Sequence, residues 1–129
     1  MAIAEENLQP SQTYADGVAE GKFLYQRCES CGRAVFTPRL ACNHCGSTAV
    51  RFQESSGTGT VYSTTAVAVR DAPSYSVCLV DLDDGFRMMS TVVGVPADDV
   101  TIGMRVRAHV EAGSDERPGR VVFSPEEAT

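Results

Sequence analysis

The sequence of 129 residues lacks any apolar run close to the ~20 residues that a membrane-spanning helix needs. Its start holds Glu5 and Glu6 rather than a basic stretch followed by an apolar one, so we expect no secretory signal. Lysine is nearly absent, with Lys22 alone, and the formal net charge is −6. A general nucleic-acid binder needs Lys and Arg for the phosphates. We therefore expect a cytoplasmic protein that binds neither nucleic acid nor membrane.

Catalytic signatures are also missing. The sequence contains no Gly-x-Ser-x-Gly elbow, P-loop or dinucleotide fingerprint. Of the two histidines, His109 is expected on the polar face of a strand. It is interpreted either as a solvated or partner-facing side chain or as a general base. Cys78 lies in an apolar run and is interpreted either as a small buried hydrophobic residue or as a nucleophile. We assign no catalytic residue and define no cofactor-binding residue.

The sequence does contain five cysteines, four of them in two Cys-x-x-Cys pairs, Cys28/Cys31 and Cys42/Cys45. An odd number without an export signal indicates a reducing compartment, where paired cysteines more often hold a metal. Each pair suits two adjacent corners of a tetrahedron, and a glycine follows each pair. We predict a structural zinc site made by these four thiolates. Iron in a rubredoxin-like site, disulfides, and His44 in place of one cysteine remain alternatives.

Charge and cysteine content predict three parts: an N-terminal arm (1–21), a zinc ribbon (22–51) and a larger acidic domain (52–129). The arm holds four acidic side chains and no basic one, whereas the ribbon holds five basic side chains and one acidic one. The third part holds twelve acidic and six basic side chains. Because the ribbon is too short to bury a sufficient core, we expect its fold to depend on the metal.

A short helix is expected in the arm, capped by Ser11 or Thr13 and ended by Gly21. Such a helix is marginal alone in water, so it must pack against another part of the protein. The first ten residues are expected to be disordered.

From residue 52 onward the pattern predicts strands and no long helix. A five-stranded Greek-key barrel of the OB type fits this count and length, with a small β-sandwich as the alternative. Asp83-Asp84-Gly85 predicts a hairpin turn. Together with Asp81, its acids form either a solvated hairpin tip, a metal site or an acid/base pair. The expected strands are Thr60–Arg70, Tyr75–Leu82, Phe86–Val95, Met104–Ala112 and Gly119–Ser124.

Two segments are candidates for contact with another protein. Phe36–Arg39 joins an apolar residue, a proline and an arginine on a loop between the cysteine pairs, where docking and packing on its own ribbon both remain open. Met88 and Met89 must point to opposite faces of a strand. One of them is expected in the core, and the other is a candidate contact.

Together these segments resemble the DUF35 family, whose members combine a rubredoxin-like zinc ribbon with a C-terminal OB domain. The resemblance covers about residues 12–125 and rests on the order of the motifs. After the cysteine ribbon come Gly-Thr-Gly-Thr-Val-Tyr-Ser-Thr-Thr (57–65), Val-Cys-Leu-Val-Asp-Leu-Asp (77–83), Gly-Phe-Arg-Met-Met-Ser (85–90), Val-Val-Gly (92–94) and Ile-Gly-Met (102–104).

The resemblance implies a non-catalytic subunit of a thiolase-fold enzyme that acts on acyl-CoA, in a heterotetramer. Assemblies of this kind include steroid side-chain retro-aldolases, thiolases and acyltransferases. The family's metal positions map onto Cys28, Cys31, Cys42 and Cys45. Its proline-rich loop maps onto Phe36, Pro38 and Arg39 as a partner interface, with Thr37 where a second proline is common.

Two other functions remain open from the sequence. OB barrels and zinc ribbons both serve as single-stranded nucleic-acid binders, although the acidic barrel segment lacks a basic groove. A stand-alone acyl-CoA binder is the second alternative, and for it the net charge of −6 is unfavourable because CoA is polyanionic.

Overall fold

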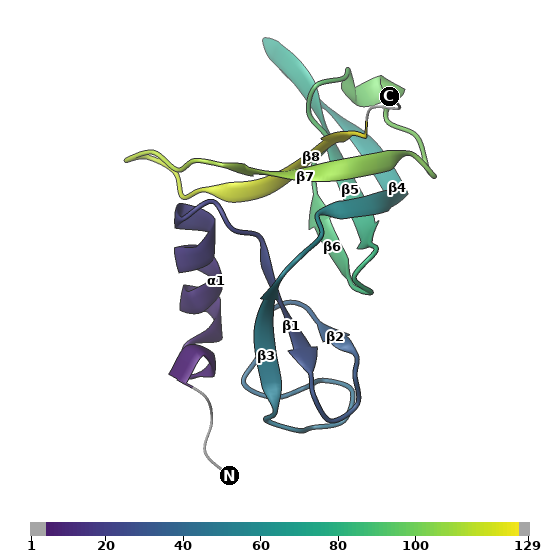
Figure 1. The fold of residues 1–129 in the computed structure, drawn as a ribbon. Helices are drawn as coiled ribbons and strands as arrows, with labels where there is room; N and C mark the ends of the chain where they lie inside the picture. The colour runs from purple at the N-terminus through teal and green to yellow at the C-terminus, as the bar shows by residue number, and fades with distance from the viewer. Residues whose placement is uncertain (1–4, 127–129) are drawn as a thin grey trace. The chain divides into compact units, whose positions relative to one another are not determined.

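The computed structural model describes residues 5–126 and has a mostly β fold with one short N-terminal helix (Figure 1). The expected fold class is confirmed: a zinc-ribbon-like cysteine cluster precedes an antiparallel sheet of the OB type. None of the helices within residues 5–126 is long and apolar enough to cross a membrane. The chain forms two compact units. Within the described residues, the first comprises 5–55, 84–86 and 110–120, and the second comprises 56–83, 87–109 and 121–126.

The first unit is built on a three-stranded antiparallel sheet in the order β2-β1-β3. Its strands are β1 (Leu24–Cys28), β2 (Ala34–Val35) and β3 (Val50–Glu54). The central strand places Arg27 opposite Ala34 on one side and Arg51 on the other. Its small buried core consists of Cys28, Val35, Cys42 and Val50. Two of these four residues are metal-ligand candidates, so this core and the cysteine cluster share side chains.

The helix α1 (Pro10–Ala19) follows a short 3-10 segment, η1 (Glu5–Asn7). Proline stands in the first turn, where its missing N–H costs nothing. The expected cap by Ser11 or Thr13 is wrong, because the helix begins before both residues. The Thr13 hydroxyl donates instead to the Glu6 carbonyl, 2.6 Å away.

The N-terminal segment is ordered from residue 5, so the expected disorder of the first ten residues is wrong for residues 5–10. Residues 1–4 lie outside the described part of the chain. The cause is Asn7, which is fully buried and whose amide donates to the Val50 carbonyl at 2.6 Å. This bond ties η1 to β3.

An aromatic cluster fills the rest of the first unit. Phe86 is its centre, with Tyr25 stacked at 5.1 Å between ring centroids and Phe36 stacked at 4.9 Å. Phe23 meets Phe86 edge-on at 6.0 Å, and Tyr14 of α1 meets Phe36 edge-on at 5.7 Å. The predicted strand Phe86–Val95 is observed only from Arg87, so Phe86 precedes it and its ring packs in this cluster. Among these contacts, the one between Tyr14 and Phe36 joins the helix to the cluster.

The OB-type sheet has five strands in the order β6-β5-β4-β7-β8, and most of it lies in the second unit. Each expected strand has an observed counterpart, although the third is much shorter than expected. The buried apolar side chains of this sheet include Val61, Val80, Val106 and Phe123. The strands are β4 (Thr58–Val69), β5 (Ala72–Leu82), β6 (Arg87–Ser90), β7 (Arg105–Glu111) and β8 (Arg120–Pro125), with a 3-10 turn η2 (Ala97–Asp99) between β6 and β7.

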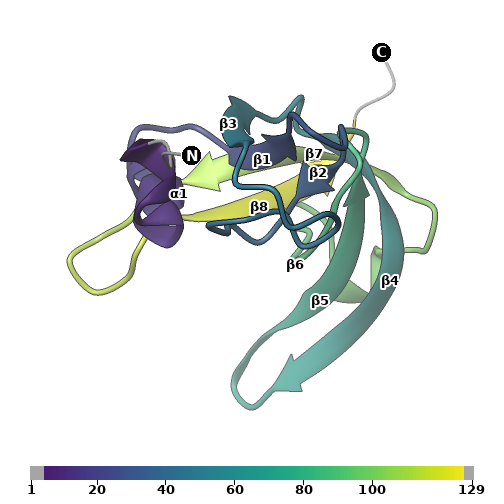
Figure 2. The same ribbon diagram turned by 90° about the horizontal axis from the view of Figure 1, so that it is seen from below.

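The longest feature of the second unit is the β4–β5 hairpin (Figure 2). Strand β4 has register irregularities between Val61 and Ser63 and between Val67 and Val69. The expectation that this long segment bends is therefore confirmed. Such a bulge places two residues opposite one and increases the local twist.

Candidate metal centre

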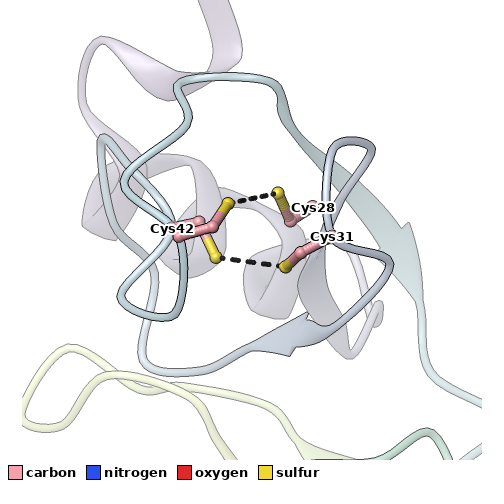
Figure 3. Close-up of side chains that lie close together, drawn as sticks. Cys28, Cys31 and Cys42 are labelled. Carbon is pink, nitrogen blue, oxygen red and sulfur yellow. Dashed lines mark hydrogen bonds between the residues drawn. The ribbon is translucent and has the colours of Figure 1, made fainter.

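The four cysteines of the two Cys-x-x-Cys pairs come together in the first unit. Their sulfur atoms all lie within 4.8 Å of one another. Cys28 Sγ is 3.6 Å from Cys45 Sγ, and Cys31 Sγ is 3.7 Å from Cys42 Sγ, so each close approach joins one pair to the other (Figure 3). All five cysteines of the chain are free. The disulfide alternative is therefore not the observed arrangement.

The two pairs sit on matching turns. Cys28 N–H donates to the carbonyl five residues on, and Cys42 N–H does the same, at 2.9 and 2.8 Å. Gly32 and Gly46 each donate back to the first cysteine carbonyl of their turn, both at 2.8 Å. Their φ angles of +77° and +81° are ones that L side chains rarely adopt, which explains a glycine at both places.

Backbone N–H groups point at the sulfur atoms inside these turns. The His44 N–H donates to Cys42 Sγ at 3.3 Å. The Cys31 N–H is the main cause that lowers the pKa of Cys28 to about 6. The Ser47 N–H acts to lower the pKa of Cys45, but the neighbouring sulfurs, Cys28 first, together with burial raise it to about 11. Burial acts to raise the pKa of Cys42, but the His44 and Cys45 N–H groups lower it overall, so the thiolate form is favoured at Cys28 and at Cys42.

The donor set fits zinc. Four thiolates bound at about 2.3 Å to one tetrahedral zinc lie about 3.8 Å from one another. The distances of 3.6 and 3.7 Å match this edge length. Donated N–H groups offset the negative charge of the thiolates, as the surroundings of structural zinc sites commonly do. Four sulfurs leave no position for water or substrate, so the arrangement suits a structural ion rather than a catalytic one.

The His44 imidazole is not a member of this cluster, although its backbone N–H contacts it. Its Nε2 lies 3.3 Å from the Ala34 carbonyl, which accepts, and its Nδ1 lies 3.4 Å from an Arg33 guanidinium nitrogen, which donates. Within residues 5–126, the cluster able to hold a metal contains the four cysteines and not this histidine. The structure therefore does not support His44 as a substitute ligand.

The candidate partner loop is only partly available. The Phe36 ring is packed between Phe86 and Tyr14, as the aromatic distances above show. Pro38 is half-buried, whereas Arg39 and Leu40 are exposed. Of the predicted interface residues, Arg39 alone presents an exposed side chain.

A buried amide pair, which the sequence analysis missed, holds this loop in place. Gln26 is fully buried in β1; its Nε2 donates to the Arg39 carbonyl at 2.8 Å, and its Oε1 accepts from the Arg39 N–H at 2.7 Å. The same Nε2 donates to Asn7 Oδ1 at 3.0 Å. No sequence pattern marks this pair, because the burial of Gln26 follows from contacts with segments distant in the sequence.

The three aspartates around the predicted turn each bond to a different partner. Asp81 pairs with Arg87, and Asp83 accepts two hydrogen bonds from Arg105, at 2.9 and 2.7 Å. Arg105 is the main cause that lowers the pKa of Asp83 to about 2. Asp84 accepts from the Ser55 hydroxyl. No group including these acids was found, within residues 5–126, that could hold a metal.

His109 and Cys78 each contact one hydroxyl side chain. His109 is exposed and its Nε2 lies 2.5 Å from the Ser124 hydroxyl. Cys78 is buried and donates to the Thr64 hydroxyl at 3.3 Å. Within residues 5–126, the observed hydrogen bonds of these two residues include no acidic or basic side chain that would activate either of them.

Comparison with known proteins extends these observations. Residues 15–51 match the family model of the ChsH2 rubredoxin-like zinc ribbon domain, and residues 52–111 match that of the ChsH2 C-terminal OB-fold domain. The chain is 34% identical over 95 residues to a probable enoyl-CoA hydratase alpha subunit of Thermomonospora curvata, covering 70% of this chain and 30% of that protein. It is 34% identical over 90 residues to a DUF35 domain-containing scaffold protein of Methanocaldococcus jannaschii, covering 64% and 62%. It thus spans less than two thirds of either curated relative.

Solved structures agree with this assignment. A chain described as Ltp2-ChsH2(DUF35) aldolase superimposes with a TM-score of 0.79 at 30% identity, covering 91% of this chain and 94% of that one. A DUF35 protein of unknown function from Sulfolobus solfataricus superimposes with a TM-score of 0.67 at 17% identity and supports the fold alone. The chain therefore belongs to the DUF35 family, with a ChsH2-type rubredoxin-like zinc ribbon followed by an OB-fold domain.

Proposed function

We propose that this chain is a non-catalytic accessory subunit of a thiolase-fold enzyme acting on acyl-CoA. The observation that carries the proposal is the likeness, over 91% of the chain, to a protein whose description joins ChsH2(DUF35) to Ltp2 in an aldolase. A second relative is described as a scaffold protein. The larger subunit supplies the catalytic groups, and this chain stabilises it and helps to enclose the acyl-CoA.

In this proposal the ion has a mechanical role. Zinc held by Cys28, Cys31, Cys42 and Cys45 fixes the two turns between which the Phe36–Arg39 loop lies. Gln26 fixes the far end of that loop through the Arg39 backbone. The exposed Arg39 side chain is then presented from a stiff support, which lowers the entropy cost of docking.

The charge of the ribbon supports contact with an acyl-CoA held mainly by the enzyme. Its five basic side chains outnumber one acidic side chain, and four thiolates with one zinc leave a charge of about +2. Interaction with CoA phosphates is favoured there and disfavoured on the rest of the acidic chain. The division into 1–21, 22–51 and 52–129, the heterotetramer and the cytoplasmic location stay predictions.

Co-expression tests the proposal. The tagged chain is produced with each thiolase-fold subunit of the source organism, and we expect one of them to form a stable complex whose acyl-CoA activity depends on the chain. The isolated chain is expected to show neither activity nor tight binding of a CoA ester by calorimetry. Full activity and stability of every such enzyme without the chain, or tight acyl-CoA binding by the chain alone, would contradict the proposal.

A further inference from the structure

The end of the β4–β5 hairpin is a two-stranded ribbon with no further strand beside it among residues 5–126. Strand β7 pairs with β4 along Thr58–Thr60, and backbone bonds on that side end at Val61. Strand β6 pairs with β5 along Cys78–Asp81. Beyond these points, no strand of the described chain, residues 5–126, borders the hairpin, and Figure 2 shows it running past its neighbours in the second unit. Residues 65–75 are exposed except for the half-buried Val67.

The two edges of this ribbon differ. Strand β5 carries Pro73, which has no N–H to offer and protects its edge against pairing. The β4 edge from Tyr62 to Val69 reads Tyr-Ser-Thr-Thr-Ala-Val-Ala-Val, with no charged residue and no proline. Natural sheets protect open edges with charged residues and prolines. An edge that has neither and is rich in β-branched residues is a template for another strand.

One face of the hairpin continues this edge with apolar side chains. The register places Val67 opposite Tyr75 and Leu79 opposite Met89, and paired residues share a face. The opposite face carries the buried Ser76, Cys78 and Val80. Met89 is 69% exposed and Tyr75 is 49% exposed. Met89 is therefore the candidate contact among the two methionines, since Met88 is buried.

A rigid polar anchor borders the same face. The Arg87 guanidinium lies 3.5 Å from the centre of the Tyr62 ring, and Asp81 holds it through two hydrogen bonds at 2.6 and 3.1 Å. Tyrosine, arginine and methionine are enriched where proteins bind each other. Because Arg87 is already held in one orientation, little side-chain entropy is lost when another protein covers it.

We propose that the open β4 edge, Tyr62–Val69, binds an extended, uncharged segment of the larger enzyme subunit by strand addition. The inference rests on the proposed function and names the docking surface. An edge with no charge along eight residues selects a neutral strand, since an opposed charge would be left desolvated. The net charge of −6 opposes pairing with a second copy of the chain. The docked strand is apolar at alternate positions, on the side it shares with Val67.

A matched pair of variants tests the edge. Ala68→Lys adds a charge to the open β4 edge, and Ser74→Lys adds the same charge to the protected β5 edge near the same tip. Both positions are exposed, so both variants are expected to keep the unfolding midpoint of the wild type. With the enzyme subunit identified by co-expression, Ala68→Lys is expected to raise the Kd at least tenfold, and Ser74→Lys less than twofold.

Hydrogen exchange gives a second readout that side-chain contact alone would not produce. Amides of residues 62–69 are expected to exchange at least tenfold more slowly in the complex than in the isolated chain. Unchanged exchange there, or equal effects of the two lysines, overturns the inference while the complex itself still supports the proposed function. Failure of every enzyme subunit to bind the wild-type chain refutes the proposed function and the inference with it. A homodimer that Ala68→Lys dissociates would overturn the assignment to the enzyme.

Discussion

Replacing Gln26 with alanine tests how the candidate partner loop is held. Gln26 is fully buried, and its side-chain amide makes three hydrogen bonds of 2.7 to 3.0 Å, two with the Arg39 backbone and one with Asn7. Within residues 5–126, no buried side-chain nitrogen or oxygen lacks a partner. The substitution therefore removes three bonds and strands three polar groups at once.

The expected cost is about 3 kcal/mol. A typical intramolecular hydrogen bond contributes about 1 kcal/mol net, and a buried group left without a partner costs about 1–3 kcal/mol. Water entering the space of the lost side chain recovers part of the larger figure. Against the usual stability of about 5–15 kcal/mol, this loss is large enough to lower the unfolding midpoint clearly.

Urea unfolding of the zinc-loaded protein measures the effect. Gln12→Ala is the matched control, because Gln12 is exposed and bonds only to Asp16 on its own helix among the contacts observed. We expect a change below about 0.5 kcal/mol for this control. Gln26→Glu should destabilise as much as alanine, since a carboxylate would face two acceptor oxygens. A Gln26→Ala protein as stable as the control would refute the reasoning.

Three further predictions concern the loop, the sheet and the ion. Phe36→Ala should lower stability by about 2–3 kcal/mol because its half-buried ring loses the contacts with Phe86 and Tyr14, whereas Arg39→Ala should keep stability and weaken enzyme binding. Asp83 adds stability above its unfolded pKa of about 4 that is lost as pH falls toward about 2, so the deficit of Asp83→Asn at pH 7 should close in that window; a pH-independent deficit would contradict the ion pair. Chelation or Cys28→Ser should unfold the first unit, seen as fast amide exchange in β1–β3.

The architecture could be predicted because strong local patterns specify it. Two Cys-x-x-Cys turns with following glycines, and strands of β-branched residues bounded by turns, reappear in the structure at nearly the expected residues. These features depend on neighbours close in sequence. The same is true of Met88 and Met89, since alternation along a strand alone assigns them to opposite faces.

What the sequence could not give are contacts between distant segments. Phe86 follows a turn in the chain, yet its ring packs on Tyr25 and Phe36 far earlier in the sequence. Asn7 is polar and near the terminus, which suggests disorder until its bond to Val50 is seen. No sequence periodicity predicts such contacts. Without knowledge of the contact with Phe86, Phe36 is interpreted as an exposed docking residue rather than a packed one.

X-ray absorption at the zinc edge, combined with metal analysis of the purified chain, tests the central claim most directly. The account predicts one zinc per chain surrounded by four sulfur atoms at about 2.3 Å, with no nitrogen or oxygen in the first shell. Iron bound by the same four sulfur atoms would change the identity of the ion but not the proposed four-cysteine ligand set. A chain without stoichiometric metal that keeps the exchange protection of β1–β3, or a shell containing imidazole or water, would contradict it.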